Sequence, residues 1–308
     1  MKLTKNYFIS EEELVEPLKN SGNHHLYLIR VKKQTFILKK YSTKEPERIS
    51  REVDFYNFLE KNNFTKIPKL IDFDVNKSYL ITNYLDTKNN IIDSINNEHI
   101  DNYASFINTI NSFSNIKSYK NDAKDSFALP QDFIALLLNI LEIYKKSPLK
   151  EAEQFSANLE EIEKIILNFK INKNILKNLP SRILSPSDVG FHNTLISDDS
   201  MYFFDFEYSG LDSPLKLVSD FILQPRYEIS ALQSKIFLQS LNFVDREFIN
   251  QLNIIFPLFV IKWILIFYNF LDPKNNIKYE NYKTSNFTQR INNAERYFKI
   301  LKERNEIY

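Results

Sequence analysis

Three glycines in a chain of 308 residues limit what this sequence can fold into more than any other feature. Average usage near 7% would give a chain of this length roughly 20 glycines. Glycine is most needed where the backbone takes a positive φ angle or approaches a ligand closely. Gly22, Gly190 and Gly210 are therefore expected to mark such positions.

The rest of the composition excludes several classes of chemistry. The chain has no cysteine, which excludes disulfides, zinc–thiolate sites, iron–sulfur clusters and cysteine nucleophiles. With only four histidines, a multi-histidine metal site is nearly excluded as well. Lys and Arg together number 40 against 39 for Asp and Glu, so the net charge is +1. That balance lacks the basic footprint of a general nucleic-acid binder, and we expect no nucleic-acid partner.

One apolar run, Ile254 to Leu271, approaches the length of a membrane span. Pro257 and Lys262 interrupt it, and a charge at mid-membrane depth costs several kcal/mol on insertion scales. The run therefore predicts a buried core helix and no membrane span. The N-terminus has no apolar core of signal-peptide length, so we expect a cytoplasmic protein. No obligate protein partner is evident from the sequence.

The first 85 residues combine short β-rich runs with one helical pattern. Strands are expected at 25–31, 35–41, 70–75 and 79–83. Between them, apolar residues recur at spacings of three and four, as on one face of a helix: Ile49, Val53, Tyr56 and Leu59. Ser42 and Glu45 before this pattern suggest a capping box.

Helical patterns dominate from about residue 89 onward, with one β-rich island at 182–207. Helices are expected at 97–113, 131–146, 150–169, 214–223, 229–240, 246–270 and 287–304. The fold class is therefore predicted as α+β, with a small β-rich N-terminal lobe at 1–85 and a larger helical C-terminal lobe at 86–308.

The β-rich island carries the polar residues of greatest interest. Its sequence at 182–210 is RILSPSDVGFHNTLISDDSMYFFDFEYSG. Two short strands joined by a turn at 197–200 set Ile196 opposite Met201. Counting back along this hairpin brings Asn193 next to Asp205, and Asp188 lies five residues before Asn193 on the same loop.

These residue types suit a particular chemistry. An amide oxygen and a carboxylate at the end of a hairpin are hard ligands, which favour Mg²⁺ over softer metals. A further carboxylate nearby can orient a hydroxyl group and accept its proton, and together these are the parts that phosphoryl transfer needs. The alternative is a polar turn cluster with a purely structural role. The spacing alone is not specific, because Asp245 and Asn250 repeat it in a helical stretch.

The island resembles the aminoglycoside phosphotransferase and choline kinase group, which shares the protein-kinase-like fold. In that group a catalytic Asp opens a D-x-x-x-x-N loop, and a D-x-E sequence follows after a short hairpin. The resemblance implies that Asp188 is the catalytic base and that Asn193 and Asp205 hold Mg²⁺. Glu207 matches the last position of D-x-E and receives no firm role.

One departure from the group's pattern bears on activity. The group usually has His-Gly before the catalytic Asp, and this chain has Pro186-Ser187. An inactive member of the group is therefore an alternative. The resemblance also suggests that Asp220 supports the catalytic loop, against the alternative of an ordinary helix-surface residue.

The resemblance carries expectations for the small lobe too. Gly22 is expected in a turn that covers the nucleotide phosphates. Lys39 is expected on the strand 35–41, and Glu52 on the helix that follows, as the partner of Lys39. Alternation along the strand puts Lys39 and Lys40 on opposite faces, so only one of them can point inward. A plain turn and solvated side chains are the alternatives. Backbone groups near Asn83 to Leu85 are expected to bind the adenine edge.

The sequence thus predicts a small-molecule phosphotransferase. It would move the γ-phosphoryl group of ATP, or of GTP, to a substrate hydroxyl with Mg²⁺. Expected acceptors are amino sugars or aminoglycosides, amino alcohols, and other sugar-like metabolites. The alternative is a nucleotide-binding pseudokinase that regulates a partner. A protein-directed kinase is disfavoured, because no Ala-Pro-Glu sequence follows Asp205.

Overall fold

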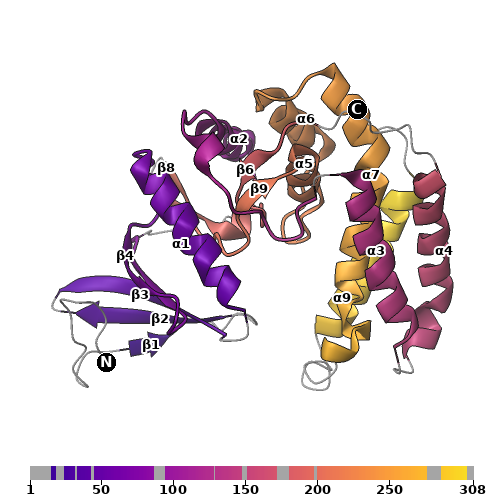
Figure 1. Cartoon of the computed structure of the whole chain (residues 1–308), viewed down its shortest axis with the longest axis horizontal. Coiled ribbons are helices and arrows are strands. Elements are labelled where there is room, and N and C mark those ends of the chain that lie inside the picture. The colour runs from indigo at the N-terminus through magenta and orange to yellow at the C-terminus, as the bar shows by residue number, and fades with distance from the viewer. Residues whose placement is uncertain are drawn as a thin grey trace. The chain divides into compact units, whose positions relative to one another are not determined.

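The computed structural model of the chain is drawn in Figure 1. The residues that the structure describes are 15–18, 24–31, 33–42, 45–86, 94–127, 129–147, 151–171, 180–197, 200–275 and 286–303. They form two compact units. The first comprises Met1–Asp125 and Ile183–Asp212, and the second comprises Ser126–Arg182 and Ser213–Tyr308. The lobe boundary predicted at residue 85 stays a prediction, since the first unit includes residues from both sides of it.

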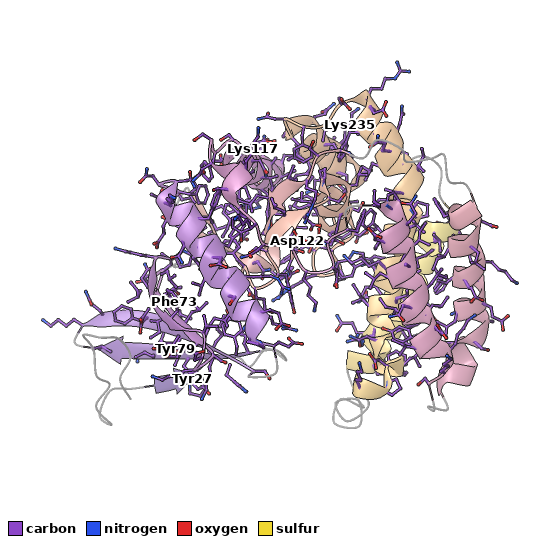
Figure 2. All side chains as sticks on the ribbon, viewed as in Figure 1. Tyr27, Phe73, Tyr79, Lys117, Asp122 and Lys235 are labelled. Carbon is purple, nitrogen blue, oxygen red and sulfur yellow. The ribbon has the colours of Figure 1, made fainter. Side chains whose placement is uncertain are left out.

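The first unit contains an antiparallel sheet with the strand order β1-β2-β3-β5-β4. Its strands are β1 (Val15–Pro17), β2 (His24–Val31), β3 (Gln34–Tyr41), β4 (Leu70–Asp74) and β5 (Tyr79–Asn83). The predicted strands are all present, whereas β1 was not predicted because three residues are too few to show alternation. One apolar cluster of the sheet is formed by Ile29, Val31, Leu38 and Ile81, with Tyr27 and Tyr79 packed against it (Figure 2).

Helix α1 (Pro46–Lys61) packs on the strands β3, β4 and β5 of this sheet. The four apolar residues that predicted the helix are all buried. The predicted Ser42–Glu45 capping box is wrong, because Pro46 begins the helix and makes Glu45 the N-cap residue, without a side-chain cap. Proline fits the first helical position, since its φ angle is already helical and the N–H that it lacks would have no partner there.

The described remainder of the first unit comprises one α-helix, two 3₁₀ helices and two short ladders. These elements are α2 (Asn97–Asn111), η1 (Ile116–Ser118), β6 (Ile183–Ser185), η2 (Phe191–Asn193), β7 (Thr194–Ser197), β8 (Ser200–Phe203) and β9 (Gly210–Asp212). The ladder of β7 and β8 pairs Ile196 with Met201, which confirms the predicted register. Strand β6 pairs with β9, and the side chain of Asn111 makes two hydrogen bonds to the backbone of Leu184, at 2.8 and 2.9 Å.

The second unit is helical. Its elements are α3 (Pro130–Lys145), α4 (Glu151–Ile171), α5 (Pro214–Leu223), α6 (Ala231–Ser240), α7 (Arg246–Phe267), η3 (Asn269–Leu271), η4 (Pro273–Asn275) and α9 (Asn286–Lys302). The helices predicted from residue 97 onward are all found, with ends within three residues of those expected. The α+β class, with a small β-rich N-terminal region and a larger helical part, is confirmed.

By length and composition α7 could cross a membrane, but more than half of its apolar stretch is buried inside the protein. It packs against α3, α5 and α9, and its last carbonyl groups accept hydrogen bonds from Tyr144 and Arg290. This packing is that of a core helix, as the sequence predicts.

The described glycines differ in what their positions require. Gly190 has an extended backbone, with a φ angle of 165°, so its conformation does not need glycine. Gly210 lies at the start of β9, where the chain runs beside Asp122 (labelled in Figure 2) and Ala123. A Cβ atom on Gly210 would lie 2.3 Å from the backbone nitrogen of Ala123. Gly22 lies outside the described residues.

We expect Gly210→Ala to lower the free energy of unfolding by about 3 kcal/mol, because the added methyl group meets backbone atoms that cannot move aside as a side chain would. Urea unfolding followed by circular dichroism measures this. Gly190→Ala is the comparison, and it should cost less because its φ angle is accessible to alanine. Equal losses for the two variants would contradict this account of Gly210.

Candidate active site

A buried lysine lies at the centre of the site. Strand β3 presents Lys39 inward, where it is 4% exposed, while Lys40 on the opposite face is exposed. The Lys39 ammonium group donates a hydrogen bond of 2.7 Å to Glu52 on α1 and a second one to Asp205. It also lies 3.6 Å from Glu207. The structure therefore brings together Lys39, Glu52 and Asp205, which the sequence placed in one site.

Three carboxylates surround the single Lys39 ammonium group. Burial lowers the pKa of Lys39, but Asp205, Glu52 and Glu207 outweigh that effect and raise it, so Lys39 stays a cation. Burial and the neighbouring Asp205 raise the pKa of Glu52 despite Lys39. Oxygen atoms of the three carboxylates lie within 4.8 Å of one another. Such a concentration of negative charge fits an added cation.

Phe206 anchors the segment 205–207, which follows β8. The Phe206 side chain is 1% exposed, with its ring centroid 4.7 Å from that of Phe55 and 5.2 Å from that of Tyr56 on α1. Asp205 just before it has a φ angle of 65°, which aspartate tolerates better than most residues. Asp205 and Glu207, on either side of this anchor, both reach Lys39.

The loop that carries Asp188 begins with a strained turn. The Asp188 N–H donates to the Pro186 carbonyl at 2.8 Å, and Ser187 between them has a φ angle of 64°. The Ser187 N–H in turn donates to the buried Ser185 hydroxyl at 2.9 Å. A positive φ angle here gives a physical reason for glycine before the catalytic Asp in the resembling group. Serine adopts the same conformation in this chain, at a cost of about 1 to 2 kcal/mol.

The carboxylate of Asp188 is accessible and polarised by its neighbours. Its side chain is 37% exposed, and one oxygen lies 3.3 Å from Nε2 of His192. Burial raises the pKa of Asp188, but contacts with His192 and Asn193 outweigh burial and lower it. Asp188 is therefore ionised at neutral pH and can accept a hydrogen bond or a proton from a hydroxyl group.

Asn193 links this loop to the segment of Asp205. Its side-chain amide nitrogen donates to the backbone carbonyl of Asp188 at 3.0 Å. Its backbone carbonyl accepts a hydrogen bond from the Phe204 N–H at 3.1 Å. Because the amide nitrogen is used in this way, the amide oxygen is the atom that can bind a cation. Oxygen atoms of Asn193 and Asp205 are the hard ligands that Mg²⁺ prefers, so the residues present fit this metal.

Two backbone N–H groups of the segment expected at the adenine ring already make hydrogen bonds within the protein. The N–H of Asn83 donates to Lys69, and the N–H of Tyr84 donates to Thr35, so both belong to the sheet. Among the described residues of this segment, Leu85 is the first without such a backbone–backbone hydrogen bond. The predicted roles of Asn83 and Leu85 stay predictions, as does that of Gly22, which lies outside the described residues.

Sequence reasoning missed two basic residues of the site. Arg48 on α1 lies 3.3 Å from Glu207, and His24 on β2 lies 3.4 Å from the same carboxylate. His24 is 6% exposed. Arg48 stands four residues before Glu52, so it shares one helix face with a predicted site residue, and that spacing was the available signal.

In the second unit, both oxygens of Asp220 accept hydrogen bonds of 2.7 Å from Lys262. Lys216 lies 3.4 Å away from the same carboxylate. Asp220 is 4% exposed, so it is not an ordinary surface residue. These ion pairs give it a part in the packing of α5 on α7.

No protein-family model matches the chain, and no curated protein sequence matches it. Solved structures do match over most of its length. Choline kinase LicA from Streptococcus pneumoniae is 18% identical, with 96% of this chain and 95% of that chain covered and a TM-score of 0.62. Plasmodium vivax ethanolamine kinase is 15% identical, with 96% and 84% covered and a TM-score of 0.65.

A spectinomycin phosphotransferase in complex with ADP and spectinomycin is 13% identical, with 95% of this chain and 90% of that chain covered and a TM-score of 0.62. At such low identity these likenesses establish the fold. The predicted resemblance to aminoglycoside phosphotransferases and choline kinases, with their protein-kinase-like fold, is therefore confirmed at the level of structure.

The charge of Glu207 leads to a prediction on stability. Burial raises its pKa, but His24, Lys39 and Arg48 outweigh burial and bring it to about 2, below the ordinary value of 4.5. A carboxylate with a lowered pKa stabilises the folded state above its unfolded pKa and loses that effect as the pH falls toward the folded one.

We therefore expect Glu207→Gln to be less stable than the wild type by roughly 3 kcal/mol at pH 7, and the difference to shrink from pH 5 toward pH 3. Urea unfolding across this pH range measures it. Glu47→Gln removes an exposed charge from the same helix as Arg48 and should cost under about 1 kcal/mol. A difference for Glu207→Gln that stays constant down to pH 3 would refute the assignment.

Proposed function

We propose that this protein is a small-molecule kinase, which transfers the γ-phosphoryl group of ATP, or of GTP, to a hydroxyl group with the help of Mg²⁺. The observation that carries the proposal is the joint arrangement of the buried Lys39–Glu52–Asp205 cluster and the Asp188–Asn193 loop within one unit. The likeness to choline, ethanolamine and spectinomycin kinases in fold supports it.

Each residue has a defined part in the proposed reaction. Lys39 binds phosphate oxygens of the nucleotide, and Glu52 holds Lys39 in place. Asn193 and Asp205 hold Mg²⁺, which when bound neutralises charge on the phosphates. Gly22 and the backbone at Asn83 to Leu85 contact the nucleotide.

The bond changes involve the acceptor and Asp188. Asp188 accepts a hydrogen bond from the acceptor hydroxyl and orients its oxygen toward the γ-phosphorus. As the new oxygen–phosphorus bond forms, the bond from the γ-phosphorus to the bridging oxygen breaks, and the nucleoside diphosphate leaves. The hydroxyl proton passes to the Asp188 carboxylate, whose lowered pKa keeps it ionised beforehand.

The turn before Asp188 bears on the choice between an active enzyme and a pseudokinase. Pro186-Ser187 replaces the usual His-Gly, yet Ser187 takes a positive φ angle and its N–H donates a hydrogen bond to the Ser185 hydroxyl. His192 contacts the carboxylate from the other end of the loop. These contacts favour an active enzyme over the pseudokinase.

The proposed acceptors are amino sugars or aminoglycosides, amino alcohols, and other sugar-like metabolites. Their common feature is a free hydroxyl group on a small molecule. We place the reaction in the cytoplasm, where nucleoside triphosphates are available, and the proposal requires neither nucleic acid nor a protein partner.

Release of ADP from Mg-ATP across a panel of such molecules tests this function. We expect an acceptor-dependent rate that Asp188→Asn lowers by about 100-fold or more, because the variant cannot accept the hydroxyl proton. Mass spectrometry of the product should show one added phosphoryl group. The melting temperature of the variant should stay near that of the wild type, since the side chain is partly exposed.

Asp245→Asn is a matched control. Asp245 and Asn250 repeat the spacing of Asp188 and Asn193, but Asp245 caps α7 by accepting a hydrogen bond from the Phe248 N–H at 2.7 Å. Asparagine caps a helix equally well, so this variant should keep the full rate. Nucleotide binding without turnover of any acceptor would favour the pseudokinase. Failure to bind any nucleotide would refute both functions.

A further inference from the structure

Glu207 is surrounded by basic side chains from three elements. The carboxylate is 3% exposed and lies 3.3 Å from Arg48 on α1, 3.4 Å from His24 on β2 and 3.6 Å from Lys39 on β3. A buried carboxylate is costly unless it is paired, and removal of a partner leaves an uncompensated charge. The contacts of Glu207 therefore join α1 and the sheet to the segment that follows β8.

Arg48 is the partner that ties this segment to α1. Its side chain is 7% exposed and lies in the first turn of the helix, on the same face as Glu52 one turn later. Its guanidinium group also pairs with Glu45 and lies 5.0 Å from the ring of Tyr208. A buried arginine with these contacts fixes the helix relative to residues 207 and 208.

Three residues of α1 are linked to three successive residues of the segment after β8. Arg48 reaches Glu207, Phe55 packs on Phe206, and Glu52 shares the Lys39 ammonium group with Asp205. Residues 206 and 207 thus contact the helix directly, and Asp205 is linked to it through the Lys39 ammonium group of β3. Any shift of α1 would move the Asp205 carboxylate.

We propose that Arg48 and Glu207 are positioning residues, which hold the Asp205 carboxylate where a nucleotide-bound cation needs it. This inference rests on the proposed function, because it assigns Asp205 to the cation. Neither residue contacts the reacting atoms. Their part is to keep α1 and residues 205–207 together before the nucleotide arrives.

Hydrogen exchange of the nucleotide-free full chain tests the contact itself. In Arg48→Met and in Glu207→Gln, backbone amides of 203–211 should exchange several-fold faster than in the wild type, because local opening becomes easier. Amides of α7 in the second unit should not change. Arg51→Met is the matched control, since it removes the same charge from the same helix without a contact to Glu207. Unchanged exchange at 203–211 in both variants would overturn the proposal.

Calorimetric titration with ADP, with and without Mg²⁺, tests the positioning. The gain in ADP affinity that Mg²⁺ gives the wild type should fall by about 10-fold in Arg48→Met, the scale seen when a residue supporting a metal ligand is removed. Affinity for ADP without Mg²⁺ should change little. Arg48→Lys keeps the charge and should recover part of the gain. The double variant should lose no more than the worse single variant, because each single substitution already breaks the ion pair that Arg48 and Glu207 share.

The outcomes separate the two claims. If Mg²⁺ strengthens ADP binding to the wild type and equally to the variants, the positioning proposal fails while the proposed function stands. If Mg²⁺ has no effect on the wild type, the proposed function fails, and with it the role assigned to Arg48 and Glu207. Faster exchange at 203–211 together with loss of the Mg²⁺ effect is the result that supports the proposal.

Discussion

The Lys39 ammonium group, buried among the carboxylates of Glu52, Asp205 and Glu207, determines how the first unit is assembled. A lysine buried without partners would lose its charge or prevent folding. Its partners come from positions 13 and 166 residues away in the sequence. Helix α1 and the segment after β8 must therefore meet at β3, and Phe206 supplies the apolar contact that holds them there.

The same cluster is the physical basis for the proposed nucleotide and cation. Three carboxylates share Lys39, and burial together with repulsion from the nearby Asp205 raises the pKa of Glu52 despite Lys39. A divalent cation would reduce that repulsion, and phosphate oxygens would give Lys39 another acceptor in place of Asp205. The loop of Asp188 lies in the same unit and is tied to this segment through Asn193, so the proposed acid–base group and the proposed metal ligands form one connected structure.

Local patterns in the sequence predicted most of the fold and part of the site. Apolar periodicity located the helices. Hairpin counting placed Asn193 next to Asp205, and the N–H of Phe204, just before Asp205, donates to the Asn193 backbone carbonyl. The strands β1 and β9 were not predicted because three residues are too few to show periodicity. The contacts of Glu207 with Arg48 and His24 were not predicted because they join residues far apart in the chain, and the spacing of Arg48 to Glu52 indicates only a shared helix face. The left-handed conformation of Ser187 was not predicted either, since serine seldom adopts it.

Labelling with an acyl phosphate of ATP, followed by peptide mass spectrometry, tests the central claim most directly. This reagent acylates a lysine that lies beside the bound phosphates. We predict Mg²⁺-dependent acylation of Lys39, blocked by excess ADP, with Lys40 on the opposite face of β3 unlabelled. Labelling of Lys40 in preference to Lys39, or labelling that ADP does not block, would contradict a nucleotide site at this cluster.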